Sequence, residues 1–354
     1  MCISPVRIRN PNKGCTAELL RLTSDCESTY INVPCGVCPE CIAKKQSDLV
    51  QRVRVLSLDH YLFMYTLTYN DESLPVYRCS TGFSIRYADH NDIRLMFKRI
   101  RKDNLFGFPF LYLSVSERGS ERARPHFHGI IFIPKECDNN DPLFTAVLET
   151  KIRNTLFHEW RRNYGSTRSP IWRPLFTYHS KYVGGKRYSN FDCHYITPHS
   201  SENGESDVAF YVTKYVLKTS AQEVRLQQAL RLNLPPDEYA KVWRIVRSRC
   251  TKSHDFGSAT SKEVSYVKKQ ISASNTSPVG LHFLNPDGSR APLPRYYKKY
   301  VSPEDAISSV SARGGPLAIR DRSNDDFDRI ISLSDIRKQK ISTHDISVLT
   351  TLNE

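Results

Sequence analysis

The pattern of apolar and polar residues along the chain predicts a mixture of strands and helices. Residues 61–69, YLFMYTLTY, are β-branched and aromatic and predict a buried strand, and turn-forming residues follow at 70–75. Residues 111–117 and 126–133 predict two more strands, and the short polar segment between them predicts that they form a hairpin.

Apolar residues at helical spacing predict several helices. They cover about 44–58, about 93–100, 144–163, about 207–219 and a segment opened by Pro235 and Pro236. Residues 164–206 lack a clear period and are expected to hold one or two strands. The order strand, helix, strand, strand, helix predicts an α+β fold, in which a central antiparallel sheet of the split βαβ kind carries helices on one face.

The chain is expected to divide into three parts. Residues 1–43 form an irregular, cysteine-rich segment, residues 44–304 form the main domain, and residues 305–354 form a polar, loosely ordered tail. Residues 1–10 lack the apolar stretch of a secretory signal, and no apolar run is long enough to cross a membrane. The sequence therefore predicts a protein of the cytoplasm of the cell that makes it.

Charge narrows the expected partners. Lysine and arginine total 51 against 37 aspartates and glutamates, which leaves a formal net charge of +14. Because residues 305–354 are nearly neutral, the excess lies in the rest of the chain. Basic side chains release the counterions condensed on a nucleic acid, so this balance favours a polyanionic partner over a merely solvated basic surface.

The histidines at 126 and 128 are the sharpest chemical signal. In a strand, residues i and i+2 share a face, so His126 and His128 point together while Phe127 points to the core. Two imidazoles make half of a divalent-metal site, and Glu117, at the end of the preceding strand, could supply an acidic third ligand. The alternative is that these are two surface histidines without a metal.

A second signal lies on the predicted helix at 207–219. Tyr211 and Tyr215 are i and i+4, one above the other on the helix, and each is followed three residues later by a lysine, Lys214 and Lys218. A tyrosine hydroxyl has a pKa of about 10, so a nucleophilic tyrosine needs a nearby cation or a metal-polarised phosphate. The alternative is a pair of half-buried tyrosines on an amphipathic helix.

Cysteines are concentrated at the start of the chain, where six of the ten lie within the first 41 residues. Cys35, Cys38 and Cys41 form a CxxCxxC run, which is suggestive of structural zinc in a reducing compartment. The fourth ligand is open between Cys2, Cys15 and Cys26, and the alternative is that these are ordinary thiols in a loop.

These residues, in this order, resemble the HUH endonucleases, which pair a His-apolar-His strand with a helix that carries one or two nucleophilic tyrosines. The resemblance is greatest to the rolling-circle replication initiators of the Microviridae, especially the gokushovirus-like branch, and covers about residues 34–300. One departure is residues 250–254, CTKSH, where the family usually has a proline and glycine-rich turn. The segments that carry the resemblance are 34–41, 66–71, 117, 124–128, 211–218 and 293–297.

The resemblance implies a nicking and joining cycle on single-stranded DNA. Mg²⁺ or Mn²⁺ held by Glu117, His126 and His128 would polarise the scissile phosphate. One tyrosine would attack it, leaving a 5′-phosphotyrosine and a free 3′-hydroxyl, and the second would attack the regenerated junction, with Lys214 or Lys218 stabilising phosphate charge. The implied partners are a phage replication origin and the host replication helicase and polymerase.

Two other classes of function remain open from the sequence. A non-catalytic protein that binds single-stranded DNA would use the same basic and aromatic side chains for tracking and stacking. Another HUH enzyme, a transposase or a relaxase, would use the same histidines, although paired tyrosines favour a replication initiator. A covalent protein–DNA adduct would separate the enzymes from the binding protein.

Overall fold

A computed structural model of the protein describes residues 5–36, 38–119, 123–138, 141–183, 185–196, 225–254, 256, 261–285 and 288–315. The chain divides into two compact units, one of residues 49–263 and one of residues 1–48 together with 264–354. The predicted division at residues 43 and 304 stays a prediction. None of the helices in the described part of the chain combines the length and apolarity needed to span a membrane.

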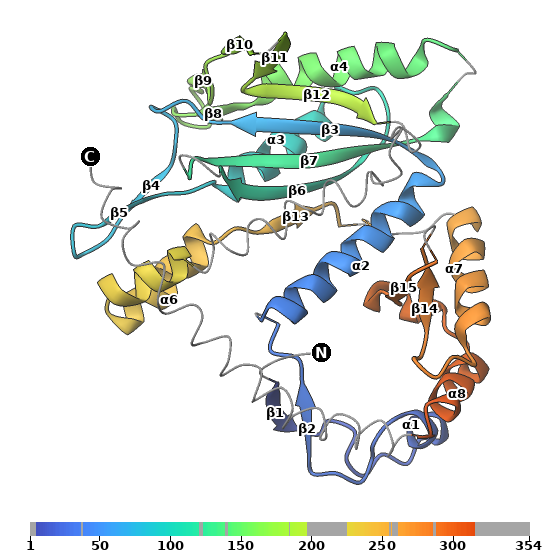
Figure 1. Cartoon of the computed structure of the whole chain (residues 1–354). Coiled ribbons are helices and arrows are strands. Elements are labelled where there is room, and N and C mark those ends of the chain that lie inside the picture. The colour runs from blue at the N-terminus through green and yellow to red at the C-terminus, as the bar shows by residue number, and fades with distance from the viewer. Residues whose placement is uncertain are drawn as a thin grey trace. The chain divides into compact units, whose positions relative to one another are not determined.

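A five-stranded sheet forms the centre of the unit at residues 49–263 (Figure 1). All neighbouring strands are antiparallel. The sheet confirms the predicted α+β fold with a central antiparallel sheet, and the strands predicted at 61–69, 111–117 and 126–133 are three of its members. The strand order is β12 (Phe191–Ile196), β3 (His60–Thr68), β7 (Pro125–Pro134), β6 (Leu111–Arg118) and β13 (Cys250–Lys252).

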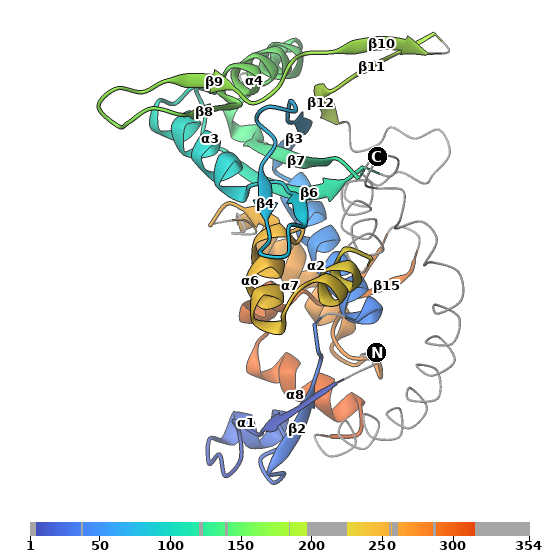
Figure 2. The same cartoon turned by 90° about the vertical axis from the view of Figure 1, so that its left-hand side faces the viewer.

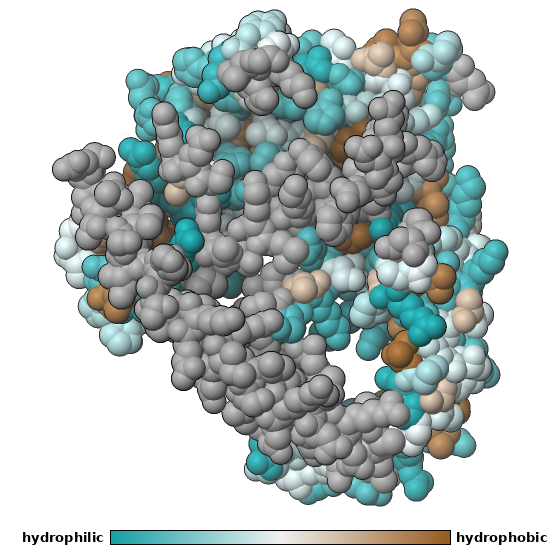
Figure 3. Space-filling model, in the orientation of Figure 1, coloured by the Kyte–Doolittle hydropathy of each residue, from teal (hydrophilic) through white to brown (hydrophobic). Residues whose placement is uncertain are grey.

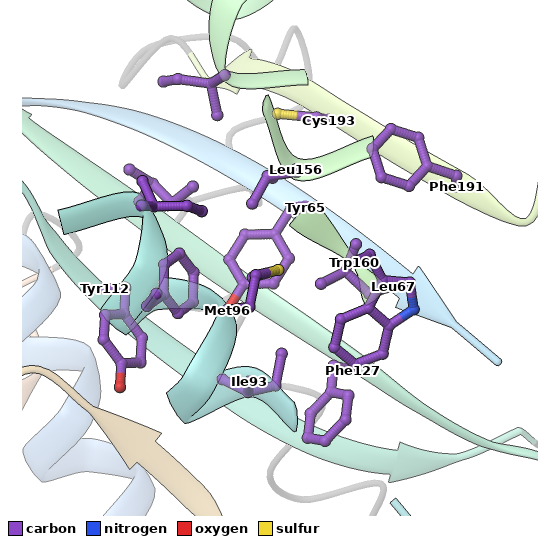
Figure 4. Close-up of a cluster of buried hydrophobic side chains, with 14 of the residues drawn as sticks. Tyr65, Leu67, Ile93, Met96, Tyr112, Phe127, Leu156, Trp160, Phe191 and Cys193 are labelled. Carbon is purple, nitrogen blue, oxygen red and sulfur yellow. The ribbon is translucent and has the colours of Figure 1, made fainter. Parts of the chain in front are cut away.

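Two helices, α3 (His90–Lys102) and α4 (Phe144–Glu159), pack on one face of this sheet and enclose its larger core (Figure 4). The side chain of Asp89 caps α3 by accepting a hydrogen bond from the backbone N–H of Asn91. Both helices lie where apolar periodicity predicts them. The fully buried large side chains of this core include Phe63, Tyr65, Phe97, Phe127 and Trp160.

The opposite face of the sheet is covered by α2 (Pro39–Ser57), whose Leu49, Val53 and Leu56 belong to a second buried cluster with Leu62 and other strand residues. The expectation of helices on one face only is therefore wrong. Burial on both faces also explains why β3 is a nearly continuous apolar run, because neither of its faces meets water.

Short hairpins and one further helix complete this unit. Residues 164–196 hold more strands than the one or two expected, and the helix predicted to reach residue 163 ends at Glu159, after which the chain turns into β8 (Figure 2). The elements are β4 (Val76–Arg78) with β5 (Ser84–Arg86), η1 (Lys135–Cys137), β8 (Arg161–Asn163) with β9 (Trp172–Pro174), β10 (Ser180–Val183) with β11 (Lys186–Ser189), and α6 (Pro236–Val246).

The other unit contains short elements at both ends of the sequence. Its strands and helix before residue 39 were not predicted, because elements of four to six residues show too few periods to detect. The coloured surface seen in Figure 3 is mostly hydrophilic. The elements are β1 (Val6–Arg9), α1 (Glu18–Thr23), β2 (Tyr30–Val33), most of α7 (Ser261–Ser274), β14 (His282–Leu284), β15 (Arg290–Pro292), η2 (Arg295–Tyr300) and α8 (Pro303–Ala312).

Candidate metal centre and active site

The β6–β7 hairpin places the three predicted metal ligands on one face of the sheet. Glu117 is paired with His126, and His128 lies two residues further along β7. Because successive strand residues alternate between faces, these three share the face covered by α2. Phe127 points the other way and packs edge-on against Trp160, as the alternation predicts.

Both imidazoles are oriented by a hydrogen bond at Nδ1. Nδ1 of His126 lies 2.9 Å from the backbone oxygen of Arg124, and Nδ1 of His128 lies 2.9 Å from Oγ1 of Thr66. A carbonyl oxygen only accepts, so the neutral ring of His126 carries its proton on Nδ1 and keeps a lone pair on Nε2. This is the arrangement by which outer groups orient metal-binding histidines.

The two Nε2 atoms face one another and Glu117. They are 3.0 Å apart, and Oε2 of Glu117 is 3.5 Å from Nε2 of His128 and 3.9 Å from Nε2 of His126. Two neighbouring ligands of Mg²⁺, each about 2.1 Å from the ion, would lie about 3 Å apart. The donor set and its spacing therefore fit a small divalent cation, and all three side chains are largely buried.

Two residues beside this cluster have positions that the sequence pattern did not reveal. Thr66 lies on β3 directly opposite His128. The guanidinium of Arg124 binds Oδ1 of Asp71 at 2.6 Å and the backbone oxygen of Tyr69 at 2.7 Å, which ties the β6–β7 loop to the turn after β3. The same hydrogen bond from Arg124 lowers the pKa of the Asp71 carboxyl.

A His–Asp pair on β12 shares this face of the sheet. Asp192 is paired with Thr66, and Thr66 with His128, so the three lie in one row across adjacent strands. Nδ1 of His194 lies 3.1 Å from Oδ2 of Asp192, which raises the pKa of His194 and lowers that of Asp192. No sequence pattern indicated this pair, since residues 164–206 have no clear period.

The remaining predicted site residues divide into two groups. Tyr211, Lys214, Tyr215 and Lys218 lie outside the described residues, so their roles stay predictions. The thiols of Cys35, Cys38 and Cys41 come together within 4.8 Å of one another. The segment at 250–254, where the sequence departs from its resemblance, begins with the edge strand β13.

Comparisons with known proteins agree with this arrangement. Residues 62–220 match a family model described as replication-associated protein ORF2, so the matched segment contains Glu117, both histidines and both tyrosines. The chain is also 30% identical over 126 residues to the replication-associated protein ORF4 of Chlamydia phage 1, which is 34% of this chain and 29% of that protein. No solved structure matched the chain. The predicted resemblance of this protein to phage replication-associated proteins is therefore confirmed.

Proposed function

We propose that this protein is a metal-dependent, tyrosine-using endonuclease of the HUH class that nicks single-stranded DNA at a phage origin and rejoins the ends. The observation that carries the proposal is the convergence of Glu117, His126 and His128, with both Nε2 atoms turned toward the carboxylate. The family match to replication-associated proteins supports the biological setting.

The donor set would hold Mg²⁺ or Mn²⁺, which supplies Lewis-acid polarisation of a phosphodiester. Thr66 and the backbone oxygen of Arg124 hold the two rings in place, so the site is assembled before DNA arrives. His194 lies on the same face and is favoured in its protonated form by Asp192, which suits it to contact a neighbouring phosphate of the bound strand.

The covalent step would use Tyr211 or Tyr215. The tyrosine oxygen bonds to phosphorus as its proton leaves to solvent, and the bond from phosphorus to the 3′ oxygen breaks. The 3′ oxygen takes up a proton and departs as a hydroxyl, so the 5′ phosphate stays on tyrosine. Lys214 or Lys218 would stabilise phosphate charge during this exchange. The second tyrosine would repeat the attack on the regenerated junction and release a joined circle.

The β8–β9 hairpin is suited to hold the single strand near this site. Trp172 is 40% exposed, with the guanidinium carbons of Arg99 and Arg161 at 4.9 and 5.0 Å from its ring centroid. The guanidinium of Arg173 lies 5.5 Å from the ring of the exposed Tyr164. Exposed rings beside arginines are the surface on which unpaired bases stack while phosphates are neutralised.

The hairpin begins at the same end of the sheet as the metal centre. The indole N–H of Trp160, one residue before β8, donates to the backbone oxygen of Thr68 at 2.6 Å. Thr68 is in turn paired with His126 across β3 and β7. A strand of DNA stacked on the hairpin would therefore be anchored next to the candidate cleavage site.

Two alternatives remain to be tested against this proposal. A non-catalytic single-stranded DNA-binding protein would use the hairpin but would leave the oriented histidines without a role. A transposase or relaxase would need the same metal centre, and the comparisons favour replication over either. The host replication helicase and polymerase are proposed as partners in the cycle on the same grounds.

Incubation of the full chain with single-stranded circular phage DNA and Mn²⁺, followed by a denaturing gel, tests the proposal. We expect nicked DNA and a covalent protein–DNA adduct. The double change His126→Ala with His128→Ala should abolish nicking and keep most of the DNA affinity, because affinity comes mainly from the basic surface. Wild-type nicking by this variant would remove the metal centre from the mechanism.

Tyrosine variants separate the steps of the cycle. Tyr211→Phe or Tyr215→Phe alone should still permit one cleavage and one adduct but no joining, whereas the double change should bind DNA and form no adduct. Full cleavage and joining by Tyr211→Phe would mean that Tyr215 acts alone. DNA binding without any adduct in the wild type would instead support the binding-protein alternative.

A further inference from the structure

Three cysteines meet where β2 passes into α2. Cys35 lies in the turn after β2, Cys38 directly precedes α2, and Cys41 lies in its first turn. Sγ of Cys35 is 4.0 Å from Sγ of Cys41, and all three sulfurs lie within 4.8 Å of one another. Thiolates of tetrahedral zinc, each about 2.3 Å from the ion, lie about 3.8 Å apart. The spacing is thus close to that of a zinc site and too long for a disulfide.

The backbone around the cysteines favours thiolates. The N–H of Cys38 lies 3.4 Å from Sγ of Cys35, in a position to donate to it. Gly36 makes the turn with φ of +77°, and the ammonium of Lys45 donates to its carbonyl at 2.6 Å, which braces the loop and brings a cation near it. The start of a 19-residue helix adds partial positive charge, and such surroundings lower the pKa of thiols.

The choice of a fourth ligand is narrowed by where the other cysteines lie. Cys15 and Cys26 interact with each other, and neither joins the cluster of three. Cys2 lies outside the described residues, but it is only four positions before Val6, whose partner in the β1–β2 ladder is Val33. Since Val33 is two positions before Cys35 and four residues of chain span up to about 14 Å, Cys2 is within covalent reach of the cluster.

We propose that Cys35, Cys38 and Cys41 bind one structural zinc ion, with Cys2 as the fourth thiolate. The ion would cross-link the N-terminus, β2 and the start of α2, in a segment too short to bury a core of its own. This site is separate from Glu117, His126 and His128 in residues and in donor chemistry, so it does not depend on the proposed nicking activity.

Metal content and Co²⁺ spectra of the purified full chain test this proposal. We expect about one equivalent of zinc in the wild type, and after exchange a Co²⁺ spectrum with strong visible bands and thiolate charge transfer in the near ultraviolet. The double change Cys15→Ser with Cys26→Ser is the matched control and should keep both. Cys2→Ser should lower the charge-transfer intensity by about one quarter, in proportion to four thiolates losing one.

Three results would overturn the proposal. Zinc below half an equivalent in the wild type would exclude a structural ion, and this measurement does not depend on any variant folding. Loss of the Co²⁺ bands in the Cys15 and Cys26 double variant would move the site to those residues. Unchanged charge transfer in Cys2→Ser would show that Cys2 is not the fourth ligand.

Discussion

Thr66 shows how a single side chain can prepare a metal centre without touching the metal. Its hydroxyl holds Nδ1 of His128, which aims Nε2 toward Glu117. Two positions along the same strand, the hydroxyl of Thr68 donates instead to the backbone oxygen of Asn190. The two threonines share a strand and a face, so they form a matched pair for separating the positioning of His128 from general effects on β3.

We therefore predict that Thr66→Val weakens Mn²⁺ binding by about 10-fold or more, because groups that orient metal ligands typically contribute that much. Calorimetric titration of the full chain with Mn²⁺ measures it. Thr68→Val, which removes an equal hydroxyl, should leave the affinity within about twofold. Equal affinities in the wild type and Thr66→Val would show that this hydroxyl does not position the ligand.

Gly129, directly after the second histidine, is required by packing. A Cβ there would lie well inside contact distance of the Tyr65 ring and of the backbone oxygen of Leu113. We predict that Gly129→Ala destabilises the fold by about 3 kcal/mol or more, since backbone atoms cannot move aside cheaply. Gly119→Ala in the same hairpin, where the nearest atoms are 3.8 Å away, is the control, and urea unfolding compares them. Similar losses for the two variants would contradict this account.

At the scale of elements, α3 is joined to the sheet through a buried histidine. His90 at the start of α3 contacts the hydroxyls of Thr251 on β13 and Ser116 on β6. Burial, and then the charge of Arg249, lowers the pKa of His90 from 6.5 to about 4. The folded protein therefore keeps this ring neutral at a pH at which the unfolded chain would protonate it.

We predict that this histidine makes the fold less stable in mild acid. Between pH 6.5 and pH 4 the unfolded chain binds the proton and the folded chain does not, so stability falls as pH falls through this window, by about 2 kcal/mol at pH 5. Urea unfolding at pH 7.5 and pH 5 measures the loss. His90→Gln should show a correspondingly smaller difference between the two pH values, and an equal difference would show that other groups cause it.

The β8–β9 hairpin is the element most suited to contact DNA. Glu159 at the end of α4 binds both Arg99 and Arg161 at 2.7 Å, which holds the two guanidiniums beside Trp172. We predict that Trp172→Ala lowers the affinity for single-stranded DNA by about 5- to 100-fold, the usual contribution of one stacked base. Tyr182→Ala, which removes an exposed ring on β10, should change it little. Fluorescence anisotropy measures both, and equal effects would argue against a specific platform.

For the whole molecule, the net charge of +14 sets how binding responds to salt. We predict that the logarithm of the single-stranded DNA affinity falls linearly with the logarithm of the salt concentration, with a slope of about −0.7 for each phosphate neutralised. The double change His126→Ala with His128→Ala should keep this slope while abolishing nicking. A slope near zero in the wild type would mean that the basic surface is not the binding surface.

The sequence by itself determined the features that depend on neighbours along the chain. The apolar periods placed the cores of β3, α3, β6, β7 and α4, and the alternation of a strand put His126 and His128 on one face with Phe127 on the other. The covalent spacing of Cys35, Cys38 and Cys41 likewise indicated that their thiols could meet. Such features follow from a period of two or 3.6 residues repeated over a short stretch.

Only the tertiary structure decided which distant segments meet. Thr66 and His128 are 62 positions apart, and no local period links them; the register of β3 against β7 brings them together. The second sheet face was likewise settled by packing, because the apolar stripe of α2 could have covered either face until α3 and α4 occupied one of them. Strand register and the competition of helices for apolar surface are properties of the folded chain, because each depends on contacts between residues that are far apart in sequence.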